Sequence, residues 1–450
     1  MDGHLLIQNA TLILPDRVVE GDLRVSDGSI ATIAPGGGLD AGSNEAVIDA
    51  TGLHLLPGAI DPHVHFREPG STEKEDLESG SRAAAAGGVT AFLDMPNNNP
   101  NATNRATLER KIAIASKKSV THHGFFIGAT NDNITDLQSV EGMEGVCGIK
   151  IFMGSSTGDL LVDQQKQLEN IFANTGGIIA THAEDEERLQ QRSAKFEHRT
   201  DIASHAECRD VECAFLATKR AASLAKDHDH RLHIVHLTSQ KEADWLQKNK
   251  GDLITTEVCT QHLTFDQDDV ESLGERVLMN PPIRYTEDRD SLWRRLKDGT
   301  IDCVVTDHAP HTLKSKSVGF PDAPAGMPGV ETSLPLMLTH ALDGKCSVSE
   351  VVSWMCEGPA KVYGIQNKGS LIEGYDADLT LVDLETKRTI TDADTWTRVG
   401  WTPYNGMELT GWPRYTIVDG EIVHKREENG PLRGLPVALP GSVGRALRFG

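Results

Sequence analysis

Between residues 54 and 310, short apolar runs alternate with longer segments of helical periodicity, and this alternation limits the folds open to the chain. The apolar runs occupy residues 54–66, 89–96, 121–130, 147–154, 177–184, 231–239, 253–263 and 301–310. Helical patterns between them include residues 106–118, 163–174, 211–226 and 289–299. Alternating strands and helices predict a parallel sheet covered by helices. Eight such units predict an α/β fold of the TIM (β/α)8 barrel type.

An open, doubly wound sheet is the alternative that the same alternation allows. That fold carries a glycine-rich phosphate-binding turn after its first strand. Here the first apolar run leads instead into DPHVHFREPG (residues 61–70), which contains no such turn. The closed barrel is therefore the expected architecture.

The two ends of the chain show short β segments without helices between them. Strand-like patterns occupy residues 5–14, 21–38 and 46–58, and they return at residues 368–390 and 414–427. We expect residues 1–54 and 366–427 to form one small β-sandwich beside a barrel of residues 55–365. Residues 428–450, rich in glycine and proline, are predicted to form a C-terminal arm.

Composition excludes several classes of protein. The 450 residues include 44 Lys or Arg and 66 Asp or Glu, a formal net charge of −22. This balance argues against nucleic acid or an anionic membrane as a partner. No signal peptide and no bilayer-spanning run is recognisable, and the seven cysteines form no CxxC pair. These features predict a cytoplasmic enzyme with reduced thiols.

Polar residues stand in or at the ends of five of the predicted strands: His63, His65, Lys150, His182, His236 and Asp307. A barrel brings the C-terminal ends of its strands to one mouth, so these side chains are expected to meet there. Side chains two residues apart on a strand face the same side, and two such imidazoles suit zinc. One histidine at a strand end is more often structural, but six such residues together point to a site.

Lys150 is the unusual member of this group, because an ammonium repels a metal ion. By itself it would be interpreted as a snorkelling or salt-bridged lysine. Two chemical roles are open to it: a desolvated base or Schiff-base lysine, or an amine that has taken up CO2 to give a carbamate bridging two cations. The carbamate fits better, because four histidines are too many for one open catalytic zinc.

The stretches GAIDPHVHFREPG (residues 58–70) and EDLESGSRAAAAGGVTAFLDMPNNNP (residues 75–100) resemble the cyclic amidohydrolases, and among them the dihydroorotases. The resemblance covers nearly the whole chain. It implies that His63, His65 and Asp307 hold one divalent metal ion. It also implies that a carboxylated Lys150 bridges this ion to a second one, held by His182 and His236. Zinc is the metal expected from these ligands, with manganese and cobalt as alternatives.

The resemblance also implies the residues that bind the substrate: Arg67, Asn97, Asn280, His311 and the backbone of Ala325 and Gly326. Dihydroorotate carries a carboxylate, which calls for a guanidinium fork and amide donors. Allantoinases typically replace the arginine of FREPG, so Arg67 is the discriminating residue. A surface ion pair of Arg67 with Glu68 or Glu73 is the alternative interpretation. The loop of residues 314–332 is expected to lie over the site, the alternative being a merely solvated connection.

The implied activity is the reversible hydrolysis of the cyclic amide of (S)-dihydroorotate to N-carbamoyl-L-aspartate, a step of pyrimidine biosynthesis. A hydroxide bridging two metal ions would attack the ring carbonyl, with Asp307 as general base and then acid. Two other interpretations stay open: another cyclic amidohydrolase, such as an allantoinase, hydantoinase or dihydropyrimidinase, or an inactive dihydroorotase-like scaffold. A homodimer is the expected assembly, and association with a carbamoyltransferase is left open.

Overall fold

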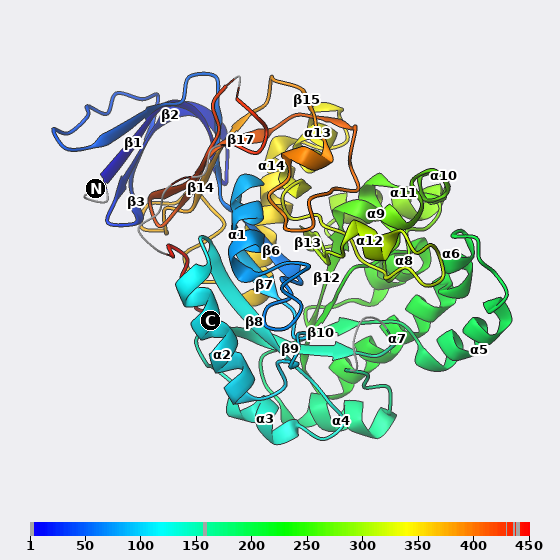
Figure 1. The fold of residues 1–450 in the computed structure, drawn as a ribbon. Coiled ribbons are helices and arrows are strands. Elements are labelled where there is room, and N and C mark those ends of the chain that lie inside the picture. The colour runs from blue at the N-terminus through cyan, green and yellow to red at the C-terminus, as the bar shows by residue number, and fades with distance from the viewer. Residues whose placement is uncertain (1–3, 156–159, 429, 435–436, 438–441) are drawn as a thin grey trace.

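The computed structural model describes residues 4–155, 160–428, 430–434, 437 and 442–450, and its central feature is an eight-stranded parallel sheet. The strand order is β13-β12-β11-β10-β9-β8-β7-β6. Figure 1 shows these strands at the centre of the larger part of the molecule, with helices around them. The strands are β6 (Ala59–Val64), β7 (Val89–Asp94), β8 (His122–Gly128), β9 (Val146–Phe152), β10 (Ile178–His182), β11 (Arg231–Ile234), β12 (Ile254–Cys259) and β13 (Cys303–Val305).

The two edge strands of this sheet come together and nearly close it. Val64 of β6 forms a parallel bridge with His308, just beyond β13. The backbone N–H of His65 donates to the carbonyl of His308 at 2.8 Å. The buried carboxylate of Asp61 accepts a hydrogen bond from the hydroxyl of Thr306 at 2.5 Å. The predicted (β/α)8 barrel is therefore confirmed.

Helices follow the barrel strands, and short polar side chains mark where several of them begin. Asp76, Asn104, Asp210 and Ser239 each accept a hydrogen bond from the first turn of the helix that follows, which satisfies N–H groups that have no partner within the helix. The α-helices are α1 (Leu77–Ala86), α2 (Arg105–Lys118), α3 (Ile134–Ser139), α4 (Gln165–Asn174), α5 (Glu186–Phe196), α6 (Ser204–Cys208), α7 (Val211–Asp227), α8 (Gln240–Asn249), α9 (Thr260–Thr264), α10 (Gln267–Leu273), α11 (Thr286–Lys297), α12 (Leu313–Lys316), α13 (Ser333–Leu342), α14 (Val348–Val352) and α15 (Gly358–Tyr363). Three further turns are η1 (Gly274–Val277), the π-helical η2 (Ser353–Glu357) and η3 (Asp392–Asp394).

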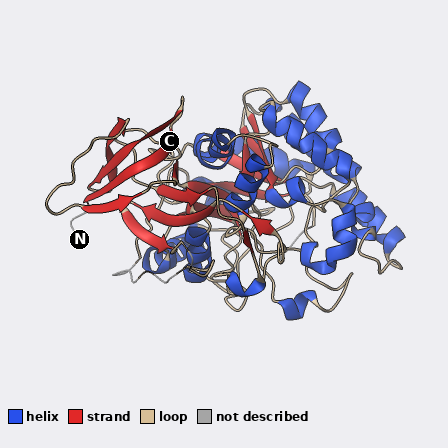
Figure 2. Cartoon of the chain, turned by 90° about the horizontal axis from the view of Figure 1, so that it is seen from above, coloured by secondary structure: helices blue, strands red, loops and turns tan. Residues whose placement is uncertain are grey.

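Segments from both ends of the chain form a second sheet, in the order β18-β17-β14-β5-β1-β2-β3, with β4 paired to β1. Figures 1 and 2 show it beside the barrel. The antiparallel pairing of β5 with β14 joins the N-terminal segment to the C-terminal one, so the predicted contribution of both ends to one sheet is confirmed. Its strands are β1 (His4–Ile13), β2 (Val18–Ser26), β3 (Ser29–Pro35), β4 (Ala46–Asp49), β5 (His54–Pro57), β14 (Leu379–Asp383), β17 (Trp412–Val418) and β18 (Glu421–Lys425), while β15 (Arg388–Thr389) and β16 (Glu408–Leu409) form a separate pair.

The first apolar run, residues 54–66, is divided between the two sheets. Its beginning is β5 of the terminal sheet, and β6 of the barrel starts only at Ala59. Gly58 separates them at a point where a Cβ would lie 2.2 Å from the hydroxyl of Thr90. Only glycine therefore allows the chain to pass from one sheet into the other at this close approach.

The end of the chain runs along the barrel near the start of β8. The backbone N–H of Gly444 donates to the carbonyl of Ser119 at 3.1 Å, and that of Leu447 donates to the carbonyl of His123 at 3.0 Å. Residues 429, 435–436 and 438–441 of the predicted arm, and residues 1–3 of the predicted sandwich, lie outside the described residues. The bounds of the three predicted parts thus stay predictions. No helix in the described part of the chain combines the length and apolar character that a membrane crossing requires.

Candidate active site

A small cavity at the mouth of the barrel brings together nearly all of the residues singled out from the sequence. His311 lies next to it, with its Nε2 atom 3.4 Å from Nη2 of Arg67. The cavity is lined by His63, His65, Arg67, Asn97, Lys150, His182, His236, Asn280, Asp307, Ala325 and Gly326, together with Phe152, Met279 and Ala309. The barrel thus places the residues as expected, and their individual roles remain to be proposed.

His63, His65 and Asp307 form the first group of candidate metal ligands. The Nε2 atoms of His63 and His65 lie 3.4 and 3.0 Å from the same oxygen of Asp307. One ligand atom from each residue lies within 4.8 Å of the others, a spacing that can hold a divalent ion. Burial pushes the pKa of Asp307 upward, but the neighbouring His63 and His65 outweigh it and hold that pKa at about 2. The carboxylate is therefore ionised at neutral pH.

His182 and His236 form a second group in the same cavity. The Nδ1 atom of His182 lies 2.9 Å from Nε2 of His236, and the rings meet edge to face. Burial lowers the pKa of both imidazoles below the ordinary value of 6.5. Both rings are thus neutral at pH 7, which is the form that binds a metal ion.

Lys150 of β9 lines this cavity, and its Nζ lies 5.1 Å from the centre of the Phe152 ring. Its side chain is buried, and Nζ has no hydrogen-bond partner among the described residues. Burial lowers the pKa of this amine to about 8. A buried ammonium without a partner is costly. The donors of this amine are therefore not used in hydrogen bonds by the described residues.

The outer nitrogen of His63 is held by a glutamate that the sequence interpretation missed. Glu257 of β12 accepts from His63 Nδ1 at 2.6 Å and from His233 Nε2 at 3.0 Å. It also accepts from the backbone N–H of His236 at 3.1 Å. A proton on Nδ1 leaves the lone pair of His63 on Nε2, toward Asp307. A lone carboxylate within the apolar run LITTEVC was the signal that could have identified it.

His65 and His182 are held in the same way, by a contact to the ring nitrogen that points away from the candidate metal position. His65 Nδ1 lies 2.7 Å from Oδ1 of Asn97. His182 Nε2 donates to Glu184 at 2.8 Å, and Arg209 binds the same carboxylate at 2.5 Å. Such outer contacts fix the tautomer and the orientation of metal-binding imidazoles. Glu184 follows β10 by two residues, and its charge there was the available signal.

Arg67 is buried beside the first group and has no ion pair among the described residues. Its side chain is 5% exposed, and Nε has no hydrogen-bond partner in the described part of the chain. Glu68, the alternative partner expected from the sequence, binds Lys118 instead at 2.7 Å. The backbone of Arg67 has a φ of 62°, unusual for a long side chain. Burial lowers the pKa of Arg67 to about 10, so the guanidinium stays charged at neutral pH.

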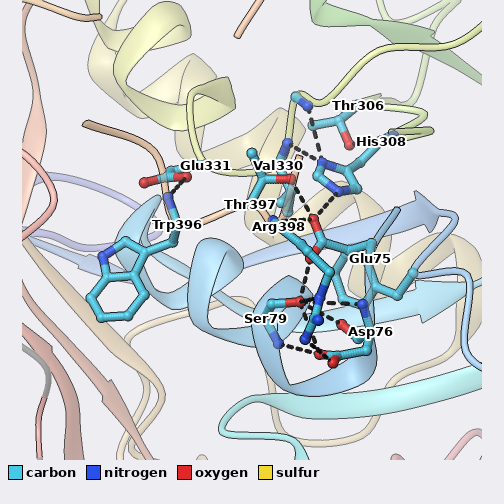
Figure 3. Close-up of polar contacts among 12 residues, drawn as sticks. Glu75, Asp76, Ser79, Thr306, His308, Val330, Glu331, Trp396, Thr397 and Arg398 are labelled. Carbon is cyan, nitrogen blue, oxygen red and sulfur yellow. Dashed lines mark hydrogen bonds and ion pairs between the residues drawn. The ribbon is translucent and has the colours of Figure 1, made fainter. Parts of the chain in front are cut away.

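The backbone beyond Asp307 is held by the polar network drawn in Figure 3. The Nδ1 atom of His308 accepts from two backbone N–H groups, and its Nε2 lies 3.5 Å from the buried carboxylate of Glu75. Glu75 also accepts from the hydroxyl of Thr397 and from the backbone N–H of Arg398 at 3.1 Å. Thr397 and Arg398, which come from the C-terminal part of the chain, thus support through Glu75 and His308 the backbone next to Asp307.

Comparison with known proteins identifies the family of this chain. The sequence model of the amidohydrolase family matches residues 54–423. The chain belongs to the amidohydrolase family. Among curated amidohydrolases, it is 34% identical to the dihydroorotase of Methanosarcina acetivorans, over 98% of this chain and 96% of that protein. It is also 34% identical to the dihydroorotase of Methanothermobacter thermautotrophicus, over 96% and 97% of the two chains. The resemblance to the dihydroorotases noted from the sequence is confirmed.

Solved amidohydrolase structures share the whole architecture. The L-hydantoinase (dihydropyrimidinase) from Arthrobacter aurescens superposes with a TM-score of 0.91 and 28% identity, over 99% of both chains. The dihydropyrimidinase from Brevibacillus agri gives a TM-score of 0.87 and 27% identity, also over 99% of both. The fold is thus shared between relatives that are named for different substrates, and only the residues of the site can separate them.

Proposed function

We propose that this amidohydrolase is a dihydroorotase, which opens the cyclic amide of dihydroorotate to N-carbamoyl-L-aspartate and closes it in the reverse direction. The observation that carries the proposal is the buried guanidinium of Arg67, whose Nε has no hydrogen-bond partner in the described part of the chain. Among the ring substrates considered, dihydroorotate brings a carboxylate that a buried, charged fork would bind. The curated relatives named dihydroorotase support the same conclusion.

We propose that the two histidine groups hold two divalent metal ions, with zinc as the expected metal. Their donor sets fit: lone pairs of neutral imidazoles face one another or the ionised Asp307, and carboxylate or amide oxygens hold outer nitrogens. The Nζ of Lys150, which has no hydrogen-bond partner among the described residues, fits a carboxylated lysine, because a neutral amine can add to CO2 with loss of one proton. Bound there, the ions would lower the pKa of a water molecule and polarise the ring carbonyl.

The chain's own residues then have separate roles. Asp307 takes the proton of the attacking water and delivers it to the leaving ring nitrogen. Arg67, His311 and Asn97 hold the carboxylate and so orient the ring carbonyl toward Asp307. Asn280 and the backbone of Ala325 and Gly326 would contact the ring itself. Each of these assignments is a proposal supported by the residue's place at the cavity.

A hydantoinase or dihydropyrimidinase is the second candidate, because the hydantoinase structures superpose so closely. Hydantoins and dihydropyrimidines lack the ring carboxylate, so they would leave the buried charge of Arg67 without a partner. An unpaired buried charge is unfavourable. The site therefore supports dihydroorotate better.

Metal analysis and a substrate panel test both proposals together. Purified protein is analysed for metal per chain and assayed for opening of dihydroorotate, allantoin and dihydrouracil. We expect two metal ions per chain and turnover of dihydroorotate alone. Turnover of dihydrouracil or allantoin in preference to dihydroorotate would replace the proposed substrate. Absence of metal and of turnover on all three rings would favour the inactive scaffold.

The remaining expectations concern the protein's surroundings. We propose a homodimer in the cytoplasm, with no nucleic acid and no membrane as partner, in keeping with the acidic charge. Association with a carbamoyltransferase is a separate hypothesis. Light scattering of the purified protein, alone and mixed with such an enzyme, measures both.

A further inference from the structure

A buried lysine lies beneath the loop that carries Ala325 and Gly326. Lys316, the last residue of α12, is 2% exposed. Its Nζ atom donates to the backbone carbonyls of Leu278 at 3.2 Å, Pro324 at 2.9 Å and Gly326 at 2.9 Å. An ammonium has three N–H donors. The three carbonyls therefore use all of them.

This arrangement differs from that of other buried lysines outside the cavity. Lys111 and Lys368 are comparably buried, and each forms an ion pair with an aspartate. No carboxylate of the described residues lies within ion-pair distance of Lys316. Because burying a charge is costly, an ammonium held by carbonyls alone calls for a reason. The positions of the three carbonyls in the chain give this reason.

The three carbonyls belong to two segments that line the cavity. Leu278 directly precedes Met279 and Asn280, and Pro324 directly precedes Ala325 and Gly326; these four following residues all line the cavity. One ammonium thus ties together the two segments, which are far apart in the sequence. Their spacing decides the width of the site on this side.

The backbone at Gly326 has little freedom to shift by itself. Its N–H donates to the carbonyl of Leu278 at 2.8 Å, and its φ is 128°. A Cβ at this position would lie 2.5 Å from the carbonyl oxygen of Ala309 and 3.1 Å from the ring of His311. Gly326 therefore packs directly against the segment beyond β13 that carries His311, and a small displacement there would change the substrate cavity.

We propose that Lys316 is a positioning residue for substrate binding, whose ammonium holds the Ala325–Gly326 backbone at a fixed distance from the segment of Asn280. The proposal rests on the proposed function, because that function places the ring of dihydroorotate between these segments. Lys316 acts through the loop and does not itself line the cavity. Its loss should therefore weaken the binding of substrate more than the chemical step.

The test replaces the ammonium with an apolar group of similar length. Lys316→Met is compared with wild type and with Lys314→Met, which changes an exposed lysine of the same short helix. We expect Lys316→Met to raise KM for dihydroorotate about tenfold or more, with a smaller change in kcat. Hydrogen exchange of the substrate-free protein should become faster at the amide of Gly326 and its neighbours, and stay unchanged in β8. Lys314→Met should match wild type in both measurements.

Two results would overturn the proposal. One is a KM within about twofold of wild type; the other is unchanged exchange at Gly326. If Lys316→Met fails to fold, Lys316→Gln, which keeps a neutral amide donor, is judged by the same criteria. The exchange measurement needs no turnover. If the wild type does not open dihydroorotate, the proposed function fails, and exchange at Gly326 still decides whether Lys316 holds the loop.

Discussion

Two clusters of histidine and acidic side chains, one buried and one largely buried, lie at opposite ends of the barrel strands. One is the cavity at the mouth. The other lies where the start of β8 meets the terminal sheet, and it contains His122, Asp378 and Asp419. In each cluster, three candidate ligand atoms lie within 4.8 Å of one another. Residue type and spacing therefore do not distinguish a candidate site from a structural ion cluster.

The distinction lies in which polar atoms already have partners. At the junction, Lys368 pairs with Asp376 at 2.8 Å and with Asp378, and Arg445 pairs with Asp419 at 2.9 Å. His122 Nε2 lies 3.1 Å from Asp378. Three cations can thus neutralise three carboxylates within the chain. At the mouth, by contrast, Nζ of Lys150 and Nε of Arg67 have no hydrogen-bond partner among the described residues. Among the members of the two clusters, the donors without a hydrogen-bond partner lie at the mouth, where a ligand could use them.

Replacement of Asp307 should have the largest effect, and it should lower activity without lowering the stability of the fold. Asp307→Asn keeps the size of the side chain but removes the proton acceptor, so kcat for dihydroorotate should fall about a thousandfold or more. Metal content should stay near that of wild type, because the histidine ligands remain, and the free energy of unfolding should change little. Steady-state kinetics, metal analysis and urea denaturation check the three expectations. Wild-type kcat in this variant would exclude Asp307 as the general base.

Replacement of Asp378 should do the reverse: it should lower the stability of the fold and leave activity unchanged. Asp378→Asn leaves His122 and Lys368 short of one buried counter-charge, so the free energy of unfolding should fall by about 3 kcal/mol. The cluster is remote from the substrate, so kcat and KM of the folded protein should match wild type. Urea denaturation and kinetics on the same preparation measure both. A lower kcat without a loss of stability would contradict the distinction between the two clusters.

The sequence predicted much of this comparison for the mouth and little of it for the junction. The eight alternating units predicted the barrel, and the barrel predicted that residues at strand ends such as His63, Lys150 and Asp307 would meet. That inference needs only the order of strands along the chain. His122 gave no comparable signal, because Asp378 and Asp419 are distant in sequence and reach it only through the packing of the terminal sheet on the barrel.

Side-chain partners were the part of the site that the sequence could not supply. Glu257 contacts His63 across the barrel, and Lys316 donates to the carbonyl of Leu278, which lies on a different loop. Neither contact follows from periodicity or spacing, because each depends on rotamers and on the path of a loop. The division of residues 54–66 between two sheets was missed for a similar reason. The run is continuous in hydrophobicity, and the change of partner occurs at one glycine.

Replacement of Arg67 tests the role of its buried guanidinium at the mouth, and we expect a smaller effect on activity than from replacement of Asp307. Arg67→Ala removes the charged donors proposed for the substrate carboxylate, so KM for dihydroorotate should rise about 10- to 100-fold. Activity on dihydrouracil, which has no carboxylate, should change far less. The ratio of kcat/KM for the two rings measures the effect and cancels general damage to the site. An unchanged ratio would mean that the carboxylate binds elsewhere.

The smallest expected effect concerns the charge of His122 and the pH dependence of stability. Burial favours the neutral imidazole, but Asp378 and Asp419 outweigh it and raise the pKa of His122 above its ordinary value of 6.5. The folded state therefore binds more protons than the unfolded state between these two pKa values. The contribution is fully present below pH 6.5 and is lost as the pH rises through the folded pKa.

Urea denaturation of wild type and His122→Gln at several pH values above and below 6.5 isolates this contribution. The free energy of unfolding of wild type should decrease more steeply with rising pH than that of the variant, because glutamine has no proton to lose. Other buried groups titrate in both proteins and cancel in the difference. His65 at the mouth provides the contrast, since burial lowers its pKa to about 4 and it stays neutral throughout this range. Equal slopes for wild type and variant would show that His122 is neutral in the folded protein, and the junction would then lack the third cation that balances its carboxylates.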